Sequence, residues 1–415
     1  MDTLLLARLQ FATTTSIHFL FVIVTLGLVT LLVGLQTAWV ITGNPKYERL
    51  TRFWGQLYVI NYVLGIATGI VMEFQFGLNW SGLSRYVGNV FGAPLAIETL
   101  VAFFLESTFL GMWIFGWHRL RRGVHLALLW GVALTAYASA FWILVANAWL
   151  QNPVGYEVRD GVAHLTDFSA LLANPTLTMA FAHVVSAALL VGGMLMAAVS
   201  AGHLIRRTTD HALHRTGLRI GLVTAALSIS MVQSFGFAQF DPVGSVQPTK
   251  FGGGDEAQAM IAEWTARFGP GDYTPPVLAS AGLGFMIMIG FTLGALWLLV
   301  PLLWRDWIIR LRFPLWLLLL ALPLPFVAAI LGWIAREVGR QPWVAYGLLP
   351  VDQAVSPVGA PAMLTSLIGF SLLLGTLAVT NWLLIARHAA RGAQDPALGR
   401  PPGQPLDLRT EPTFA

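Results

Sequence analysis

The amino-acid sequence predicts an all-α protein that crosses a membrane several times. Of its 415 residues, 56% are hydrophobic and only 11% are charged, and the mean hydropathy is +0.69, whereas roughly a quarter of the residues in a soluble domain are charged. Nine segments carry the run of about 20 apolar residues that a spanning helix needs. The chain has no cysteine, which excludes disulfides, iron–sulfur clusters and thiolate ligands.

The nine predicted spans alternate with loops of unequal charge. The loops after the first, third, fifth and seventh spans, together with the C-terminal tail, hold 17 of the 24 Lys and Arg residues. The positive-inside rule places these segments in the cytoplasm, so we expect the N-terminus outside and the C-terminus inside. No basic patch interleaves with aromatic residues, so no nucleic-acid partner is expected. The predicted spans are 11–42, 53–77, 94–117, 125–150, 175–204, 217–240, 276–304, 313–335 and 359–386.

Residues 1–393 are expected to form one helical membrane domain. Its longest external loop, 241–275, contains the sequence GGGDE, which we interpret as a flexible, solvated turn. The segment 394–415 is rich in Pro, Gly and Asp and is predicted to be a disordered cytoplasmic tail. Because the parts outside the membrane are too small for a separate catalytic domain, any chemistry is expected inside the membrane.

Ionisable side chains inside a membrane span are costly and mark candidate functional sites, and the candidates are two histidines and two glutamates. His18 and His183 are candidate ligands, and the alternatives are a structural hydrogen bond to a neighbouring helix or a proton relay. Glu98 and Glu106 are eight residues apart, so on a regular α-helix they share one broad face, about 12 Å apart along the axis. Such a pair suits a proton path, and the alternative is a pair of carboxylates kept neutral or paired for structural reasons.

The depth of the polar side chains points to a cofactor. Histidine, methionine and carboxylate at a similar depth resemble the axial ligands of buried iron porphyrins, and a His/Met pair is typical of a low-spin, electron-transferring heme. A methionine inside a span is, however, more often a packing residue. The residues expected in or near the outer half of the membrane are His18, Glu98, His183, Met288 and Glu337, with Glu106 deeper.

The segment GWIAREVGRQPW, residues 332–343, resembles the signature of a known family. It matches the pattern GWxxxExGRQPW of subunit I of cytochrome bd quinol oxidases. Further blocks resemble the same family in the same order, so the resemblance covers nearly the whole chain. These blocks are RLQFATTTSIHFLFV (8–22), FWGQLYVINYVLGIATGIVMEFQFGLNW (53–80), FGAPLAIETLVAFFLESTFLGMWIFGW (91–117) and SAFWILVANAWLQNP (139–153).

The resemblance implies two hemes b, one low-spin and one high-spin, and a heme d. His18 and Glu337 match the family's axial ligands of the two high-spin hemes, without deciding which of them is heme d. His183 and Met288 match the ligands of the low-spin heme b. The remaining matches are Glu98 and Glu106 on the proton route, Ser139 and Asn147 near the oxygen-reducing heme, and Trp333 and Arg340 beside the hemes, where Arg340 can neutralise a propionate.

Three segments depart from the family pattern. Members usually carry a basic residue two positions before the methionine ligand, whereas this chain has Met286 there, so we expect a lower potential for the low-spin heme. The register favours Met288 over Met286 as the ligand. The sixth span ends in SFGFAQFDP (234–242), where the family usually has a Gly-Asp/His segment. In the external loop, Lys250 of VQPTK matches a lysine of the family's quinol-binding loop, and the acid expected beside it is Asp255, Glu256 or Glu263.

The resemblance implies the heme-bearing subunit of a respiratory terminal oxidase in the bacterial cytoplasmic membrane. Such an enzyme oxidises quinol at the outer face and reduces dioxygen to water with protons from the cytoplasm, which charges the membrane without a pump. The implied partners are a second membrane subunit and membrane lipid, with a small accessory subunit as a further candidate.

Two alternatives stay open at this point. A divergent heme-binding homologue would take electrons from a donor other than quinol, or would sense oxygen or redox state. A proton-coupled transporter would use His18, Glu98 and Glu106, but it would also predict inverted repeats and paired helix breaks. The sequence shows neither of these features.

Overall fold

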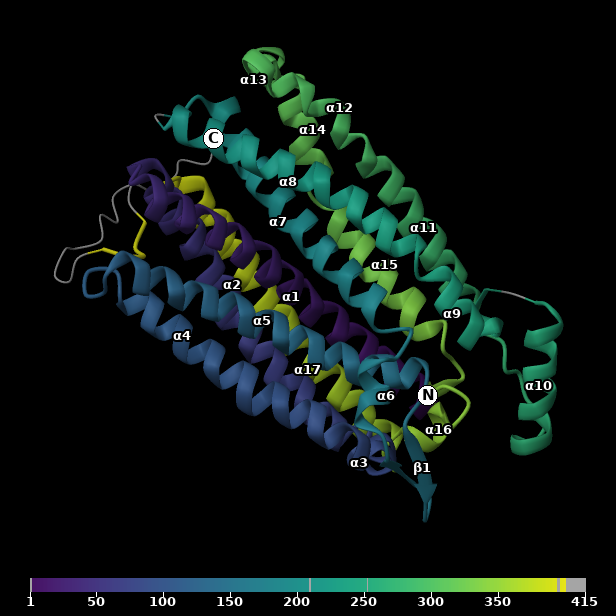
Figure 1. Cartoon of the computed structure of the whole chain (residues 1–415). Helices are drawn as coiled ribbons and strands as arrows, with labels where there is room; N and C mark the ends of the chain where they lie inside the picture. The colour runs from purple at the N-terminus through teal and green to yellow at the C-terminus, as the bar shows by residue number, and fades with distance from the viewer. Residues whose placement is uncertain (1, 209, 252, 394–395, 401–415) are drawn as a thin grey trace.

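Helices make up most of the described structure. The computed structural model describes residues 2–208, 210–251, 253–393 and 396–400. Within these residues, nine helical spans are long and apolar enough to cross a membrane, and they lie alongside one another in a bundle (Figure 1). The prediction of an all-α protein with nine spans is therefore confirmed.

The spans overlap the predicted ones, and the main differences are that the first three begin earlier than predicted. The first span begins at Thr3, because Asp2 caps it by accepting a hydrogen bond from the Leu4 amide at 3.0 Å. The second span begins at Pro45, eight residues before the predicted residue 53. The third span begins at Ser81, well before the predicted residue 94. The spans are α1 (Thr3–Thr42), α2 (Pro45–Leu78), α3 with η1 and α4 (Ser81–Ile97, Glu98–Phe103, Phe104–Phe115), α5 (Arg122–Gln151), α7 (Thr178–Arg206), α8 with α9 (His211–Phe237, Phe240–Val246), α11 with α12 (Val277–Gly294, Leu296–Leu299), α14 with α15 (Phe313–Ala321, Leu324–Val338) and α17 (Ala360–Arg391).

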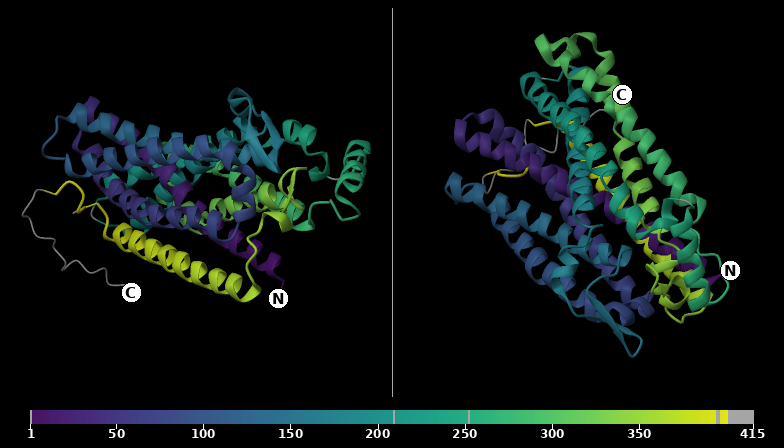
Figure 2. Two further views of the ribbon diagram at one scale, coloured as in Figure 1. Left: turned by 90° about the horizontal axis from the view of Figure 1, so that it is seen from below. Right: turned by 45° about the vertical axis from the view of Figure 1, so that its right-hand side comes forward.

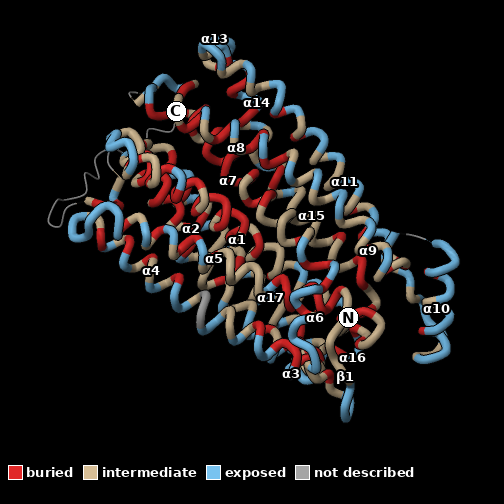
Figure 3. Tube along the Cα trace, in the orientation of Figure 1, coloured by how far each residue is buried: buried red, intermediate tan, exposed pale blue. Residues whose placement is uncertain are grey.

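Small residues bring the central helices together. A Cβ atom added to Gly27 of α1 would lie 2.1 Å from the Ala188 carbonyl oxygen of α7, and one added to Gly192 would lie 2.7 Å from the Gly27 carbonyl carbon. On the other side of α7, a Cβ on Gly221 of α8 would lie 2.5 Å from the Ala197 amide nitrogen. Such close approach of backbones is how helices associate within lipid. The buried residues in Figure 3 concentrate along α1 and α7 accordingly.

The third span is not a regular α-helix. Its middle part, η1, is a π-helix that runs from Glu98 to Phe103. It begins four residues after Pro94, a proline inside α3. Such wide turns are rare and occur frequently at functional sites. The expected 100° per residue therefore does not apply between Glu98 and Glu106.

Short elements cover one end of the bundle, where the N-terminus also lies (Figure 1). Two antiparallel hairpins, β1–β2 and β3–β4, belong to this end. The segment from Asp255 to Phe268 forms the helix α10, so the external loop is more structured than the sequence predicted. The other short elements of this end are β1 (Tyr156–Arg159), β2 (Val162–Leu165), α6 (Phe168–Leu172), η2 (Pro248–Phe251), β3 (Trp343–Ala345), β4 (Leu349–Pro350) and α16 (Val351–Ala354). The helix α13 (Trp307–Leu311), which directly follows η3 (Pro301–Asp306), lies at the opposite end (Figure 1).

The opposite end of the bundle carries the start of the C-terminal tail (Figure 2). Of the tail that the sequence predicts to be disordered, residues 394–395 and 401–415 lie outside the described residues. Residues 396–400 lie against the helices: the Leu398 side chain is buried. The His118 Nε2–H donates to the Gly399 carbonyl oxygen at 2.6 Å.

Candidate functional site

Two large cavities lie side by side within the bundle. One, of about 600 Å³, is lined by His183 and is called here the His183 cavity. The other, of about 460 Å³, is lined by His18 and is called the His18 cavity. Both volumes suit a small-molecule or cofactor site. Trp333 of α15 and Phe19 of α1 line both cavities and pack edge-to-face with ring centroids 5.2 Å apart, so they form part of the wall between them.

His18 is oriented by a hydroxyl group on the next helix. Its Nδ1 atom lies 2.9 Å from Thr68 Oγ1 of α2, and that hydroxyl donates its own proton to the Gly65 carbonyl oxygen at 2.7 Å. The Thr68 oxygen therefore accepts from His18, which assigns the proton to Nδ1 and leaves the lone pair of Nε2 free. A Cβ on Gly69 would lie 3.3 Å from the imidazole, so glycine gives this ring its space. Such fixed orientation is typical of a metal-binding histidine.

His183 shows the same arrangement on α7. Its Nδ1–H donates to the Val232 carbonyl oxygen of α8 at 2.9 Å, and a Cβ on Gly236 would lie 3.1 Å from the ring. The lone pair of Nε2 is again free among the described residues. His125 is different, because its Nε2 bonds the Trp113 carbonyl and its Nδ1 bonds a glutamine amide, so neither nitrogen is left for a ligand.

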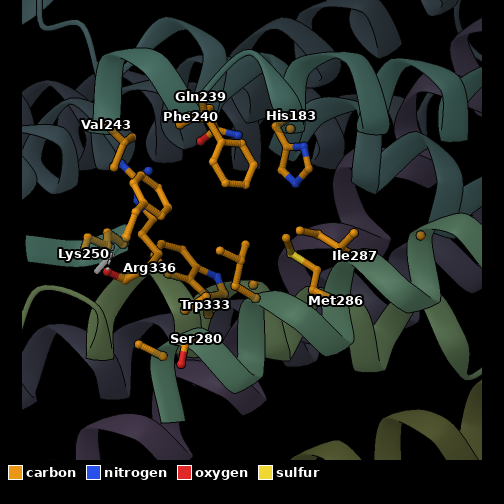
Figure 4. Close-up of a pocket in the computed structure, with 18 of the residues that line it drawn as sticks. His183, Gln239, Phe240, Val243, Lys250, Ser280, Met286, Ile287, Trp333 and Arg336 are labelled. Carbon is orange, nitrogen blue, oxygen red and sulfur yellow. Dashed lines mark hydrogen bonds between the residues drawn. The ribbon is translucent and has the colours of Figure 1, made fainter. Parts of the chain in front are cut away.

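The structure brings Met286 rather than Met288 into the His183 cavity. Figure 4 shows the Met286 side chain of α11 across the cavity from His183. Its sulfur is held close to α15, where a Cβ on Gly332 would lie 2.9 Å from it. Met288, which the register favoured, is 55% exposed and does not line either cavity. The two residues differ because positions two apart on an α-helix point in nearly opposite directions.

The last turn of α15 serves both cavities. The carboxylate of Glu337 is held on both oxygens: Oε1 accepts from Asn147 Nδ2 at 2.8 Å and Gln151 Nε2 at 3.2 Å, and Oε2 accepts from Arg340 at 2.6 Å. Arg336 Nε donates to Asn147 Oδ1 at 2.6 Å. Because neighbouring helical residues point about 100° apart, Arg336 lines the His183 cavity while Glu337 and Arg340 line the His18 cavity.

The two predicted carboxylates of the third span also line the His18 cavity. Glu98, the first residue of the π-helix, accepts a hydrogen bond from Ser139 Oγ of α5 at 2.6 Å. Glu106 is buried, and its Oε1 atom has no hydrogen-bond partner among the described residues. The His18 cavity is thus lined by Glu98, which a hydrogen bond holds in place, and by Glu106, which lies deeper in the bundle and has an unpartnered oxygen among the described residues.

A fourth carboxylate of this cavity, after Glu98, Glu106 and Glu337, was not predicted from the sequence. Glu73 of α2 lies inside the predicted second span and lines the His18 cavity with Glu98. The rule that singled out Glu98 and Glu106, an ionisable group within a span, applies equally to Glu73. The motif VMEFQF therefore carried the signal that could have identified it.

Lys250 lies at the His183 cavity without the acidic partner that the sequence predicted. Its Nζ donates to the backbone carbonyl of Arg336 at 3.1 Å. Burial lowers the pKa of Lys250 to about 7, and the nearby Arg336 adds to this shift. Asp255 and Glu256 are exposed at the start of α10, and neither they nor the exposed Glu263 line the cavity or pair with Lys250.

The helix α10 is itself part of the site, which sequence reasoning also missed. Ala257 and Ile261 line the His183 cavity. Trp264 of the same helix packs on Trp343 and Tyr346, with ring centroids 5.0 and 5.3 Å away, and Trp343 is the last residue of the GWIAREVGRQPW motif. The spacing 257, 261, 264 and 268 is that of an apolar helical face and was the available signal.

The walls of both cavities fit porphyrins that carry carboxylates. Each cavity presents one histidine with a free Nε2 atom and a second candidate ligand, Met286 or Glu337. Buried nitrogen atoms without a hydrogen-bond partner among the described residues are Arg336 NH2, Arg340 Nε and NH1, and Trp333 Nε1. Buried donors are normally paired, so these groups suit an anionic ligand, and arginine suits carboxylates in particular.

The comparisons with known proteins agree with this arrangement. The family model of the cytochrome bd terminal oxidase subunit I matches residues 6–267 and 255–393 of the chain. The chain belongs to this family. Membership makes it a terminal oxidase subunit and a multi-pass protein of the bacterial inner membrane, and the designation subunit I implies a second subunit.

Individual members of the cytochrome bd family extend this result. The chain is 36% identical to the cytochrome bd ubiquinol oxidase subunit 1 of Bacillus subtilis over 448 aligned positions, covering 95% of each protein. It is 44% identical to the cytochrome bd-II ubiquinol oxidase subunit 1 of Escherichia coli over 66% of this chain and 52% of that protein. The bd oxidase structure from Geobacillus thermodenitrificans has the same fold, with a TM-score of 0.82 at 24% identity over 94% of this chain and 99% of that one.

Proposed function

We propose that the chain is the heme-bearing subunit of a quinol oxidase that reduces dioxygen to water. The observation that carries this proposal is the pair of adjacent cavities, each with a histidine whose Nε2 is free, separated by Trp333 and Phe19. The proposed cofactors are two hemes b and one heme d, which when bound supply one-electron transfer and the site of oxygen reduction.

The geometry of the two cavities supports the proposed ligands. In the His183 cavity, His183 and Met286 would hold the low-spin heme b, in place of the expected pair of His183 and Met288. In the His18 cavity, His18 and Glu337 are the ligands of the high-spin hemes. Asn147, Gln151 and Arg340 hold the Glu337 carboxylate in one position, which is the role of outer-shell partners around a metal ligand.

The carboxylates of the His18 cavity are proposed to deliver protons. Glu106 lies deeper in the bundle and has an unpartnered oxygen, so it can exchange a proton with the cavity. Glu98 accepts a hydrogen bond from Ser139 and lies nearer the start of the same span than Glu106 does. Two carboxylates on one cavity wall supply alternating proton carriers, and protons enter from the cytoplasmic end if the N-terminus lies outside, as the distribution of Lys and Arg predicts.

Quinol is proposed to bind where the His183 cavity meets the outer loops. Lys250 lies on this wall, and α10 covers it through Ala257 and Ile261. Asp255 and Glu256 are not part of this proposed site, because they are exposed and lie off the cavity. The proposed partners are the second membrane subunit, membrane lipid and a small accessory subunit.

The experiment is a stoichiometric oxygen-uptake assay on the purified complex with its second subunit. Two quinols should be oxidised for each dioxygen reduced to two waters, because dioxygen takes four electrons and four protons. A heme-loaded complex that consumes no oxygen with ubiquinol or menaquinol, but does so with an artificial reductant, would instead support a homologue with another donor.

A further inference from the structure

The His183 cavity has a positively charged wall, and none of the described residues that line it is acidic. Among the described residues that line it, the charged side chains are Lys250 and Arg336, both at one end, while His183 and Met286 lie toward the other end (Figure 4). Neither cation has a carboxylate within 4.0 Å in the described part of the chain. The nearest acid of the motif, Glu337, faces the other cavity.

The Arg336 side chain is held in place by one hydrogen bond, but another of its donor groups is unpaired among the described residues. Its Nε–H donates to Asn147 Oδ1 at 2.6 Å, so the guanidinium is oriented by a side chain of α5. Its NH2 nitrogen is buried and has no hydrogen-bond partner among the described residues. A buried, charged donor without a partner is costly, and an anionic group in the cavity would satisfy it through a charge-assisted hydrogen bond.

The facing helix offers no substitute charge. The helix α11, Val277–Gly294, contains no Lys or Arg, and its side of the cavity carries Met286 and Ile287. The absence of a basic residue at position 286 therefore predicts a lower potential for the heme in this cavity. Arg336 changes that expectation, since it brings a positive charge to the same cavity from α15.

We propose that the guanidinium of Arg336 binds a carboxylate of the porphyrin in the His183 cavity and stabilises the reduced state of its iron. This inference rests on the proposed function, because it requires a heme on His183. A fixed positive charge in a low-dielectric cavity favours the state with one more electron. Arg336 is thus a positioning residue for the heme, and it does not touch the reacting substrate.

The test is a spectroelectrochemical titration of the low-spin heme in the purified complex. Arg336→Gln should shift the ratio of oxidised to reduced iron at a fixed potential by tenfold or more, which is a fall of 59 mV or more for a one-electron couple. Arg336→Met, which keeps a long side chain, should give the same shift and replaces Arg336→Gln if that variant does not accumulate. Arg336→Lys keeps the charge and should stay within threefold of the wild type.

Arg85→Gln is the matched control, because Arg85 is exposed on α3 and does not line the cavity. It should leave the potential unchanged. An unaltered potential in both neutral variants would overturn the inference while leaving the proposed function intact. An equal shift in Arg336→Lys would contradict the role of the charge. Absence of a low-spin heme from the wild-type complex would instead contradict the proposed function itself.

Discussion

At the scale of single residues, the site depends on which way each side chain leaves its helix. Arg336 and Glu337 are neighbours in the sequence, yet they line different cavities. Thr68 and the Val232 carbonyl each accept the Nδ1 proton of a histidine, which leaves the other imidazole nitrogen free. The direction of a side chain therefore distinguishes candidate ligands from packing residues more clearly than its depth in the membrane does.

The choice between Met286 and Met288 can be tested at this scale. Met286→Leu should remove the low-spin signature of the His183 heme, because leucine keeps the volume and lacks the sulfur. Met288→Leu is the matched control and should leave the spectrum unchanged, since Met288 is 55% exposed. Electron paramagnetic resonance of the oxidised complex measures the spin state. A low-spin signal that survives in Met286→Leu and disappears in Met288→Leu would show that α11 is rotated relative to the geometry described here.

At the scale of elements, close helix contacts and the anchored α10 shape the two cavities. The contact of Gly27 with Gly192 sets the distance between α1, which carries His18, and α7, which carries His183. The aromatic cluster of Trp264, Trp343 and Tyr346 holds α10 against the end of the GWIAREVGRQPW motif. The spacing of α1 and α7 is therefore expected to affect heme binding. The position of α10 is expected to affect donor binding.

Replacement of Gly192 should disturb the whole helix pair. Gly192→Leu places a large side chain where even a Cβ would lie 2.7 Å from the Gly27 backbone. Overpacking of this kind typically costs about 1–3 kcal/mol or more, so we expect a lower thermal midpoint and reduced heme content in both cavities. Gly34→Leu is the control, since a Cβ there has no neighbour within 4 Å. Equal thermal midpoints for the two variants would show that this helix contact is not critical.

Removal of the α10 anchor should affect the donor and not the hemes. Truncation of a buried Trp typically costs about 3–5 kcal/mol, and in Trp264→Ala this loss is expected to free α10 locally. The KM for quinol should rise several-fold while the heme spectrum stays as in the wild type. Glu263→Ala, on the exposed side of the same helix, should leave KM unchanged. A normal KM in Trp264→Ala would place the donor away from this wall.

At the scale of the whole molecule, hydropathy alone predicted the nine spans, and their membrane nature is confirmed. The rotation of α11 could not be predicted, because this helix is apolar on every side and its pattern does not select a face. The π-helix at Glu98 could not be predicted either, since hydropathy does not show how many residues each backbone hydrogen bond spans. His18, His183 and Glu337 could be selected as candidates from their type and depth, while their partners Thr68, Val232 and Asn147 required the three-dimensional structure.

The orientation of the bundle is a prediction for the whole molecule. The chain has no cysteine, so a single cysteine can be introduced and labelled without interference. Asp160→Cys, in the exposed turn between β1 and β2, should react with a membrane-impermeant maleimide on intact spheroplasts. Arg119→Cys, exposed at the opposite end, should react only after the membrane is opened. The reverse pattern would contradict the outside N-terminus.

The most direct test of the central claim is a dithionite-reduced minus air-oxidised spectrum of the purified two-subunit complex, repeated with quinol as the reductant. The two cavities predict the bands of a low-spin heme b and the red-shifted band of heme d, and quinol should reduce both. A well-folded complex without heme bands would contradict the proposal that this chain binds hemes. Bands that dithionite reduces and quinol does not would retain the hemes but contradict quinol as the donor.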